Sequence, residues 1–91
     1  MNELVGFENN YMCTAEDFGP DNPDAFAYVS IDGYPADEDE PGEVVCQVWM
    51  TRHKDVIIAW VNNGYRNNQA VLELIEDSKR QLEELWAQAH S

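Results

Sequence analysis

The 91-residue sequence carries 18 Asp and Glu against 5 Lys and Arg, which gives a formal net charge of -13, and 44% of its residues are hydrophobic. A chain of this length forms a single domain, residues 1–91, and leaves no room for a cofactor-binding fold beside a substrate domain. The aromatic content of 11% excludes a disordered chain, because such chains have few aromatic and β-branched residues.

We expect neither a membrane span nor a secretory signal. Its longest apolar run, 56–61, has six residues, whereas a helix that crosses a bilayer needs about 20. The amino-terminal residues have neither a basic segment nor a long apolar stretch, so we expect a cytoplasmic protein. In that reducing compartment we expect Cys13 and Cys46 to be free thiols, with Cys46 buried.

The first strands are predicted upstream of a long acidic loop. Leu4, Val5 and Phe7 predict an edge strand, and Thr14 with Asp17 matches a capping box for one helical turn. A second strand is predicted over Ala25 to Asp32, where aromatic residues alternate with aliphatic ones. The acidic loop, 34–42, then contains a proline near each end.

Two apolar segments, 43–52 and 55–61, predict an antiparallel hairpin that turns at residues 52–55. The second segment is apolar on both faces, so we expect it at the centre of the sheet or covered on both sides. A turn at Asn62–Gly64 follows. Alternation along the first segment places Val44, Cys46, Val48 and Met50 on one face and Val45, Gln47, Trp49 and Thr51 on the other. We expect a helix to cover the first of these two faces.

The carboxy-terminal segment predicts an amphipathic helix from about Asn68 to Ala89, with Asn67 or Asn68 as its N-cap. Leu72 alone points away from the apolar stripe, and Glu76 with Arg80 forms a favourable pair on the polar face. The stripe has eight members: Val71, Leu74, Ile75, Ser78, Leu82, Leu85, Trp86 and Ala89. The chain is therefore predicted to be an α+β domain, with a three- or four-stranded, mainly antiparallel sheet packed by this one helix.

Charge is divided unevenly along the chain. Residues 1–51 contain twelve acids and no Lys or Arg, whereas residues 52–91 contain six acids and all five bases, so the two parts carry -12 and -1. Direct nucleic-acid binding is disfavoured, because affinity for phosphate comes largely from Lys and Arg. An acidic surface is instead suited to the basic groove of a protein that itself binds DNA or RNA.

No motif in the sequence indicates catalysis, a cofactor or a metal. The EF-hand pattern fails on 37–48, because Pro41 replaces a ligand and Val48 stands where a bidentate Glu is required. The Cys and His residues are too scattered for zinc. Cys46 with His53 is the sole nucleophile and base pair to consider, and we expect a buried thiol and an exposed turn histidine instead. We therefore expect that the protein is not an enzyme.

In length, charge and coarse architecture the chain resembles the anti-restriction and anti-CRISPR proteins, small acidic inhibitors from phages and mobile elements that mimic DNA. The resemblance implies an inhibitor that binds a basic nucleic-acid-binding protein, such as a nuclease or its effector complex. The alternative is an acidic interaction or dimerisation module without mimicry, with an apolar interface around Trp49, in which a homodimer would form. The carboxylates expected to bind the partner are those of the acidic loops: Glu16, Asp17, Asp21, Asp24, Asp37, Glu38, Asp39 and Glu40.

Overall fold

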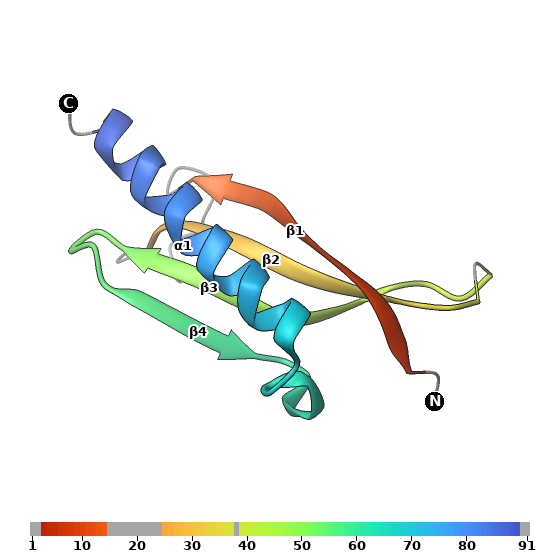
Figure 1. Ribbon diagram of the computed structural model, residues 1–91. Helices are drawn as coiled ribbons and strands as arrows, with labels where there is room; N and C mark the ends of the chain where they lie inside the picture. The colour runs from red at the N-terminus through yellow and green to blue at the C-terminus, as the bar shows by residue number, and fades with distance from the viewer. Residues whose placement is uncertain (1–2, 15–24, 38, 90–91) are drawn as a thin grey trace.

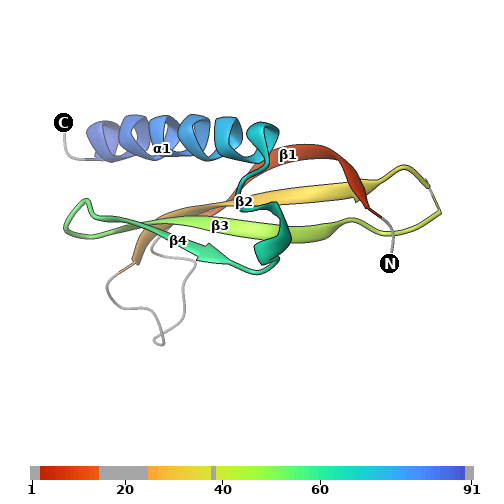
Figure 2. The same ribbon diagram turned by 60° about the horizontal axis from the view of Figure 1, so that its bottom comes forward.

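The computed structural model describes residues 3–14, 25–37 and 39–89 and shows an α+β fold, as predicted. Four antiparallel strands lie in the order β1-β2-β3-β4, and α1 crosses one face of the sheet, against β1, β2 and β3 (Figures 1 and 2). The elements are β1 (Leu4–Thr14), β2 (Ala25–Pro35), β3 (Glu43–Thr51), β4 (Val56–Trp60), the 3-10 helix η2 (Asn63–Tyr65) and α1 (Gln69–Ala89).

Strand β1 confirms the predicted amino-terminal edge strand and is longer than predicted, since it pairs with β2 along its length. Its start is attached to η2, because the Leu4 backbone N–H donates to the Tyr65 hydroxyl at 2.8 Å and the Phe7 ring meets the Tyr65 ring edge-on. The helical turn predicted from Thr14 and Asp17 lies outside the described residues.

The predicted turn between β3 and β4 is confirmed. The Thr51 backbone N–H donates to the Asp55 carbonyl at 2.9 Å, and the Thr51 hydroxyl oxygen accepts the backbone N–H groups of His53 and Asp55 at 3.2 and 3.1 Å. Lys54 takes the left-handed conformation, with φ 67°. A single threonine side chain thus organises the turn that reverses the chain into β4.

The core lies between α1 and the sheet, and one part of the predicted face assignment is wrong. Cys46, Val48 and Met50 face the helix as expected, but Val45 is also fully buried there, while Val44 is half-buried outside the core. The pairing with β2 shifts register at this point, so that a β-bulge breaks the alternation of side chains. Val45 therefore joins the core, and Val44 does not.

The position predicted for β4 is also wrong, because β4 is an edge strand rather than a central or doubly covered one. Ile58 and Trp60 pack against the core, whereas Ile57 is 55% exposed and the following Val61 is 62% exposed. An apolar run is compatible with either position, and only the pairing of strands decides between them.

Helix α1 begins at the predicted N-cap, because the Asn68 side-chain oxygen accepts the backbone N–H groups of Ala70 and Val71 at 3.0 and 3.3 Å. Leu72 is exposed, as predicted, and Ala89 is exposed although the stripe predicted otherwise. No helix in the described part of the chain is long and apolar enough to cross a bilayer. The buried positions of α1 are Val71, Ile75, Ser78 and Leu82.

The last turn of α1 explains the exposure of Ala89. Trp86 meets the Phe26 ring edge-on, with ring centroids 5.1 Å apart, at the beginning of β2. Among the described residues, Trp86 is the last one of α1 that packs against the core cluster, and Ala89 lies beyond this contact.

Candidate partner-binding surface

The loop between β2 and β3 lies at one end of the sheet (Figures 1 and 2). Its described carboxylates are exposed. The Asp37 side chain accepts the backbone N–H of Asp39 at 2.9 Å, and the Asp37 carbonyl accepts the backbone N–H of Glu40 at 3.1 Å. These two bonds close a local turn on Asp37. The carboxylates of Asp37, Asp39 and Glu40 consequently project from a hydrogen-bonded turn.

Tyr34 connects this loop to the sheet. Its ring lies so close to Gly42 that a Cβ placed there would stand 2.5 Å from a ring carbon of Tyr34. Its hydroxyl donates to the Glu8 carboxylate at 2.6 Å, and this hydrogen bond, with the negative charge of Glu8, raises the pKa of Tyr34. The β2–β3 loop is therefore held to β1 through one tyrosine.

Two carboxylates lie directly opposite each other on neighbouring strands, since Glu8 of β1 pairs with Asp32 of β2. Like charges in this arrangement repel each other across an antiparallel pair. The Asp32 carboxylate accepts hydrogen bonds from Asn10 Nδ2 at 2.7 Å and from the Ser30 hydroxyl at 2.9 Å. Both donors are neutral, so they fix the Asp32 carboxylate in place without cancelling its charge.

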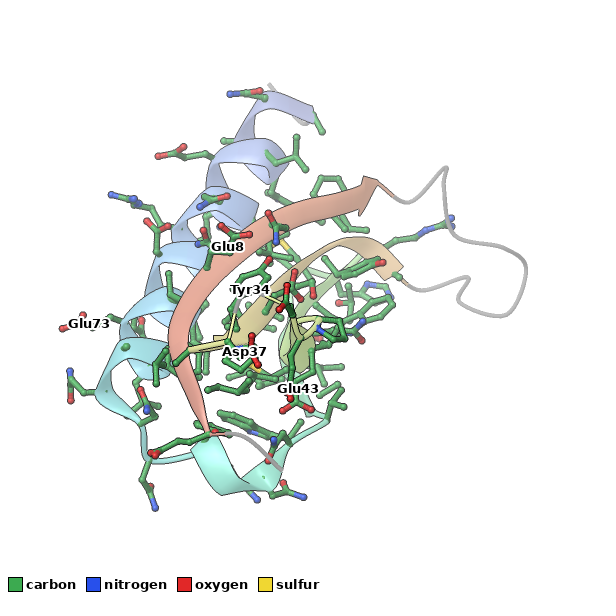
Figure 3. The ribbon with its side chains drawn as sticks, turned by 90° about the vertical axis from the view of Figure 1, so that its right-hand side faces the viewer. Glu8, Tyr34, Asp37, Glu43 and Glu73 are labelled. Carbon is green, nitrogen blue, oxygen red and sulfur yellow. The ribbon has the colours of Figure 1, made fainter. Side chains whose placement is uncertain are left out.

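Glu43 adds a further carboxylate at the start of β3, where it accepts a hydrogen bond from Asn62 Nδ2 at 3.3 Å. Figure 3 shows Tyr34, Asp37 and Glu43 at this end of the sheet and Glu73 on the helix, away from them. An open hollow of about 220 Å³ lies among the strand residues, and it is lined by Asp32, Tyr34, Gly42, Glu43 and Val44.

The set of described carboxylates at this end of the sheet is called here the acidic hairpin surface. The described residues contain two ion pairs, Lys79 with Glu76 and Arg80 with Asp77, and both lie within α1. No described carboxylate of residues 1–51 thus has a basic partner within the described chain. The acidic hairpin surface consists of Glu8, Asp32, Asp37, Asp39, Glu40 and Glu43.

Of the eight carboxylates expected to bind a partner, the structure describes three and brings them together in one loop: Asp37, Asp39 and Glu40. The other five lie outside the described residues: Glu16, Asp17, Asp21, Asp24 and Glu38. Sequence reasoning missed Glu8, Asp32 and Glu43. Strand alternation places Asp32 on the face away from the helix and could have found it, whereas the pairing of Glu8 with Asp32 depends on the register of β1.

Cys46 and His53, the nucleophile and base considered above, lie at different places, in β3 and in the β3–β4 turn. Cys46 is a free, buried thiol, as predicted, and burial raises its pKa to about 11. His53 is exposed in the β3–β4 turn. In the described part of the chain, no group of three or more Cys, His, Asp or Glu side chains could hold a metal ion.

Comparisons of the chain with protein-family models, with curated proteins and with solved structures find no match.

Proposed function

We propose that the protein is an inhibitor that binds a basic nucleic-acid-binding protein and occupies the groove in which that protein holds DNA or RNA. The observation that supports this most directly is the acidic hairpin surface. Its carboxylates come from β1, β2, the β2–β3 loop and β3, and neutral donors hold four of them, while no described Lys or Arg pairs with any.

Charge without internal partners is the property that such a role requires. A carboxylate that already forms an ion pair contributes little to a second partner, whereas one held by a neutral amide or hydroxyl keeps its full charge. Attraction between this surface and a basic groove would speed encounter, and neutral hydrogen bonds would reduce the entropy lost when the surface docks.

The test is a capture experiment with a nuclease-treated cell lysate and the immobilised protein. We expect the captured proteins to be nucleic-acid-binding proteins, to be released between about 50 and 500 mM salt, and to be displaced by a double-stranded DNA or an RNA oligonucleotide. Captured proteins that neither oligonucleotide displaces would show that the groove for nucleic acid is not the binding site, and mimicry would have to be abandoned.

A matched pair of variants locates the surface. The triple variant Asp37→Lys, Asp39→Lys and Glu40→Lys should slow association with the captured partner by about tenfold or more, since rim charges act mainly on the association rate. The control, Glu73→Lys, Glu83→Lys and Glu84→Lys, makes the same change in net charge on the exposed face of α1. Equal slowing by both variants would mean that only net charge matters.

A second candidate is an interaction module without mimicry, for which the sequence pointed to an apolar interface around Trp49. Trp49 is half-buried and stacks on Tyr28, with ring centroids 4.5 Å apart. Ile57 of β4 pairs with Trp49 and is 55% exposed, and the following Val61 is 62% exposed. Val45, which the sequence placed on the same face, belongs to the core instead.

A further inference from the structure

The outer edge of β4 is poorly protected against pairing with another strand. Residues 56–61 form the longest apolar run of the sequence and contain neither a charge nor a proline. Val56 is 37% exposed, Ile57 55% and Val61 62%. In the described part of the sheet, no strand pairs with this edge. Edge strands of soluble proteins usually carry Lys, Pro or a bulge that prevents pairing, and β4 carries none of them.

The hydrogen bonds to β3 determine which backbone groups of β4 face outward. The Thr51 N–H donates to the Asp55 carbonyl at 2.9 Å, and the Val61 N–H donates to the Val45 carbonyl at 3.0 Å. Residues that bond to one neighbour alternate along an antiparallel strand with residues that face away from it. The residues between these two bonded positions whose N–H and C=O groups face outward are therefore Val56, Ile58 and Trp60.

The two ends of β4 differ in charge. Arg52 and Lys54 lie in the turn before the strand. Asn62 follows the other end and hydrogen-bonds to the Glu43 carboxylate, at the base of the acidic hairpin surface. Asp55 offsets one of the two bases at the beginning, and Arg66, which lies 5.6 Å from the centroid of the Trp60 ring, offsets one carboxylate at the end. The edge is thus apolar along its length, with a net positive charge at its beginning and the carboxylates of the acidic hairpin surface beyond its end.

We propose that the outer edge of β4 pairs antiparallel with β4 of a second copy of this chain, centred on Ile58. In this register Ile58 of one copy lies opposite Ile58 of the other, and Val56 lies opposite Trp60. The backbone N–H and C=O groups of all three residues face outward, so this register allows all of them to form hydrogen bonds with the second copy. The result is one continuous sheet across a two-fold axis, with the same residues contributed by each copy.

Charge complementarity selects a second copy as the occupant and antiparallel as its direction. Because Ile58 faces Ile58, the residue four positions before it in one copy faces the residue four positions after it in the other. Lys54 of one copy therefore lies opposite Asn62 of the other, beside Glu43. The basic end of each edge therefore meets the acidic end of its neighbour. The two acidic hairpin surfaces point to opposite ends of the dimer, which keeps these two groups of carboxylates apart. Parallel pairing would place both acidic surfaces side by side.

Sedimentation velocity of the full chain tests the proposal in about 150 mM salt, from about 10 µM to 1 mM protein, because a contact of one strand pair is small and its affinity is expected to be weak. We expect a reversible monomer–dimer equilibrium. Ile57→Lys should raise the dissociation constant by about tenfold or more, since a lysine on an edge strand disfavours pairing. Val5→Lys is the matched control: Val5 is 63% exposed on β1, the opposite edge, so this variant should dimerise within about twofold of the original chain.

A charge exchange tests the direction of pairing. Lys54→Glu and Glu43→Lys should each weaken self-association, because each creates two like-charge contacts in its own dimer. An equal mixture of the two variants should restore dimers, since both contacts then join opposite charges. Circular dichroism confirms that each variant is folded.

Three results would overturn the proposal: a monomer at every concentration, equal behaviour of Ile57→Lys and Val5→Lys, or a mixture of charge variants that does not dimerise. The proposal does not rest on the acidic hairpin surface as a partner site. Sedimentation measures self-association alone, whereas displacement by an oligonucleotide measures partner binding, so either proposal can fail without the other.

Discussion

Single side chains decide the shape of the acidic hairpin surface. Tyr34 lies across Gly42 and donates to Glu8, so that one ring joins the β2–β3 loop to β1. A glycine is required at position 42 for close approach rather than for an unusual backbone angle, because the described glycines have no positive φ.

Gly42→Ala should lower the free energy of unfolding by about 1 to 3 kcal/mol, because an added methyl group meets atoms that are already in place. The new Cβ would stand 2.5 and 2.6 Å from two ring carbons of Tyr34 and 2.8 Å from the Gly33 carbonyl oxygen. Gly6→Ala is the control, since a Cβ at Gly6 meets nothing within 4 Å. Urea denaturation measures both; equal stability of the two variants would show that Tyr34 does not pack on Gly42.

Asp77 makes stability depend on pH. Asn9 of β1 donates to its carboxylate at 2.8 Å, and this bond, with one from Gln81, lowers the pKa of Asp77 below its usual 3.8. A lowered pKa in the folded state adds stability above the unfolded pKa, and this contribution is lost as the pH falls through the folded value. The difference in stability between the original chain and Asp77→Asn should therefore shrink between about pH 5 and pH 3.

Urea denaturation at several pH values measures this difference. Asn9→Ala should also weaken the dependence of stability on pH, because it removes the largest cause of the lowered pKa of Asp77. A constant difference between the original chain and Asp77→Asn across this range would show that Asp77 gains nothing from its contact with β1.

Helix α1 packs on the sheet through a short row of buried side chains, in addition to the hydrogen bond between Asn9 and Asp77. Val71, Ile75 and Leu82 are at most 3% exposed, and the Ser78 hydroxyl donates to the Leu74 carbonyl at 2.7 Å. The helix lies over one face of the sheet, against β1, β2 and β3 (Figure 2). The strand order makes β4 an edge, and apolar residues of β4 are exposed there.

Leu82→Ala should lower the free energy of unfolding by about 2 to 5 kcal/mol, through lost burial and a residual cavity. Leu72→Ala, on the same helix at 38% exposure, should cost less than about 1 kcal/mol. Thermal and urea denaturation measure both changes. A melting temperature unchanged by Leu82→Ala would contradict the packing of α1 on the sheet.

The distribution of charge is a property of the whole molecule. The described chain measures 43 × 26 × 20 Å, and its bases lie in the β3–β4 turn, after η2 and on α1, whereas the acidic hairpin surface has none. Self-repulsion of a net charge of -13 opposes the compact state. Keeping the carboxylates close together therefore lowers the free energy of unfolding.

Raising sodium chloride from about 10 to 300 mM should increase the melting temperature, because salt screens this repulsion. The triple lysine variant of Asp37, Asp39 and Glu40 should gain less from salt than the original chain. The salt-induced rise in melting temperature of the helix triple variant of Glu73, Glu83 and Glu84 should lie between those of the other two proteins. The reason is that Lys79 and Arg80 already offset charge on α1. Differential scanning calorimetry measures these changes, and a melting temperature independent of salt would contradict the account.

The sequence by itself determined the elements whose periodicity is local. The stripe of Val71, Ile75 and Leu82 predicts α1, and the amide of Asn68 predicts where it begins, because 3.6-residue periodicity and capping depend on neighbouring residues alone. The β3–β4 hairpin and the acidic loop were predictable for the same reason. Cys46 was expected in the core from simple alternation, and it lies there.

Only the tertiary structure decided the features that depend on pairing between distant segments. The bulge that turns Val45 into the core arises from the register between β2 and β3, and no local pattern encodes it. The apolar run of β4 is equally compatible with a central strand and with an edge strand. Glu8 and Asp32 are 24 positions apart in the sequence, and they face each other because β1 and β2 pair in one register. Alternation predicts which residues share a face, whereas strand order and register depend on the free energy of the whole sheet.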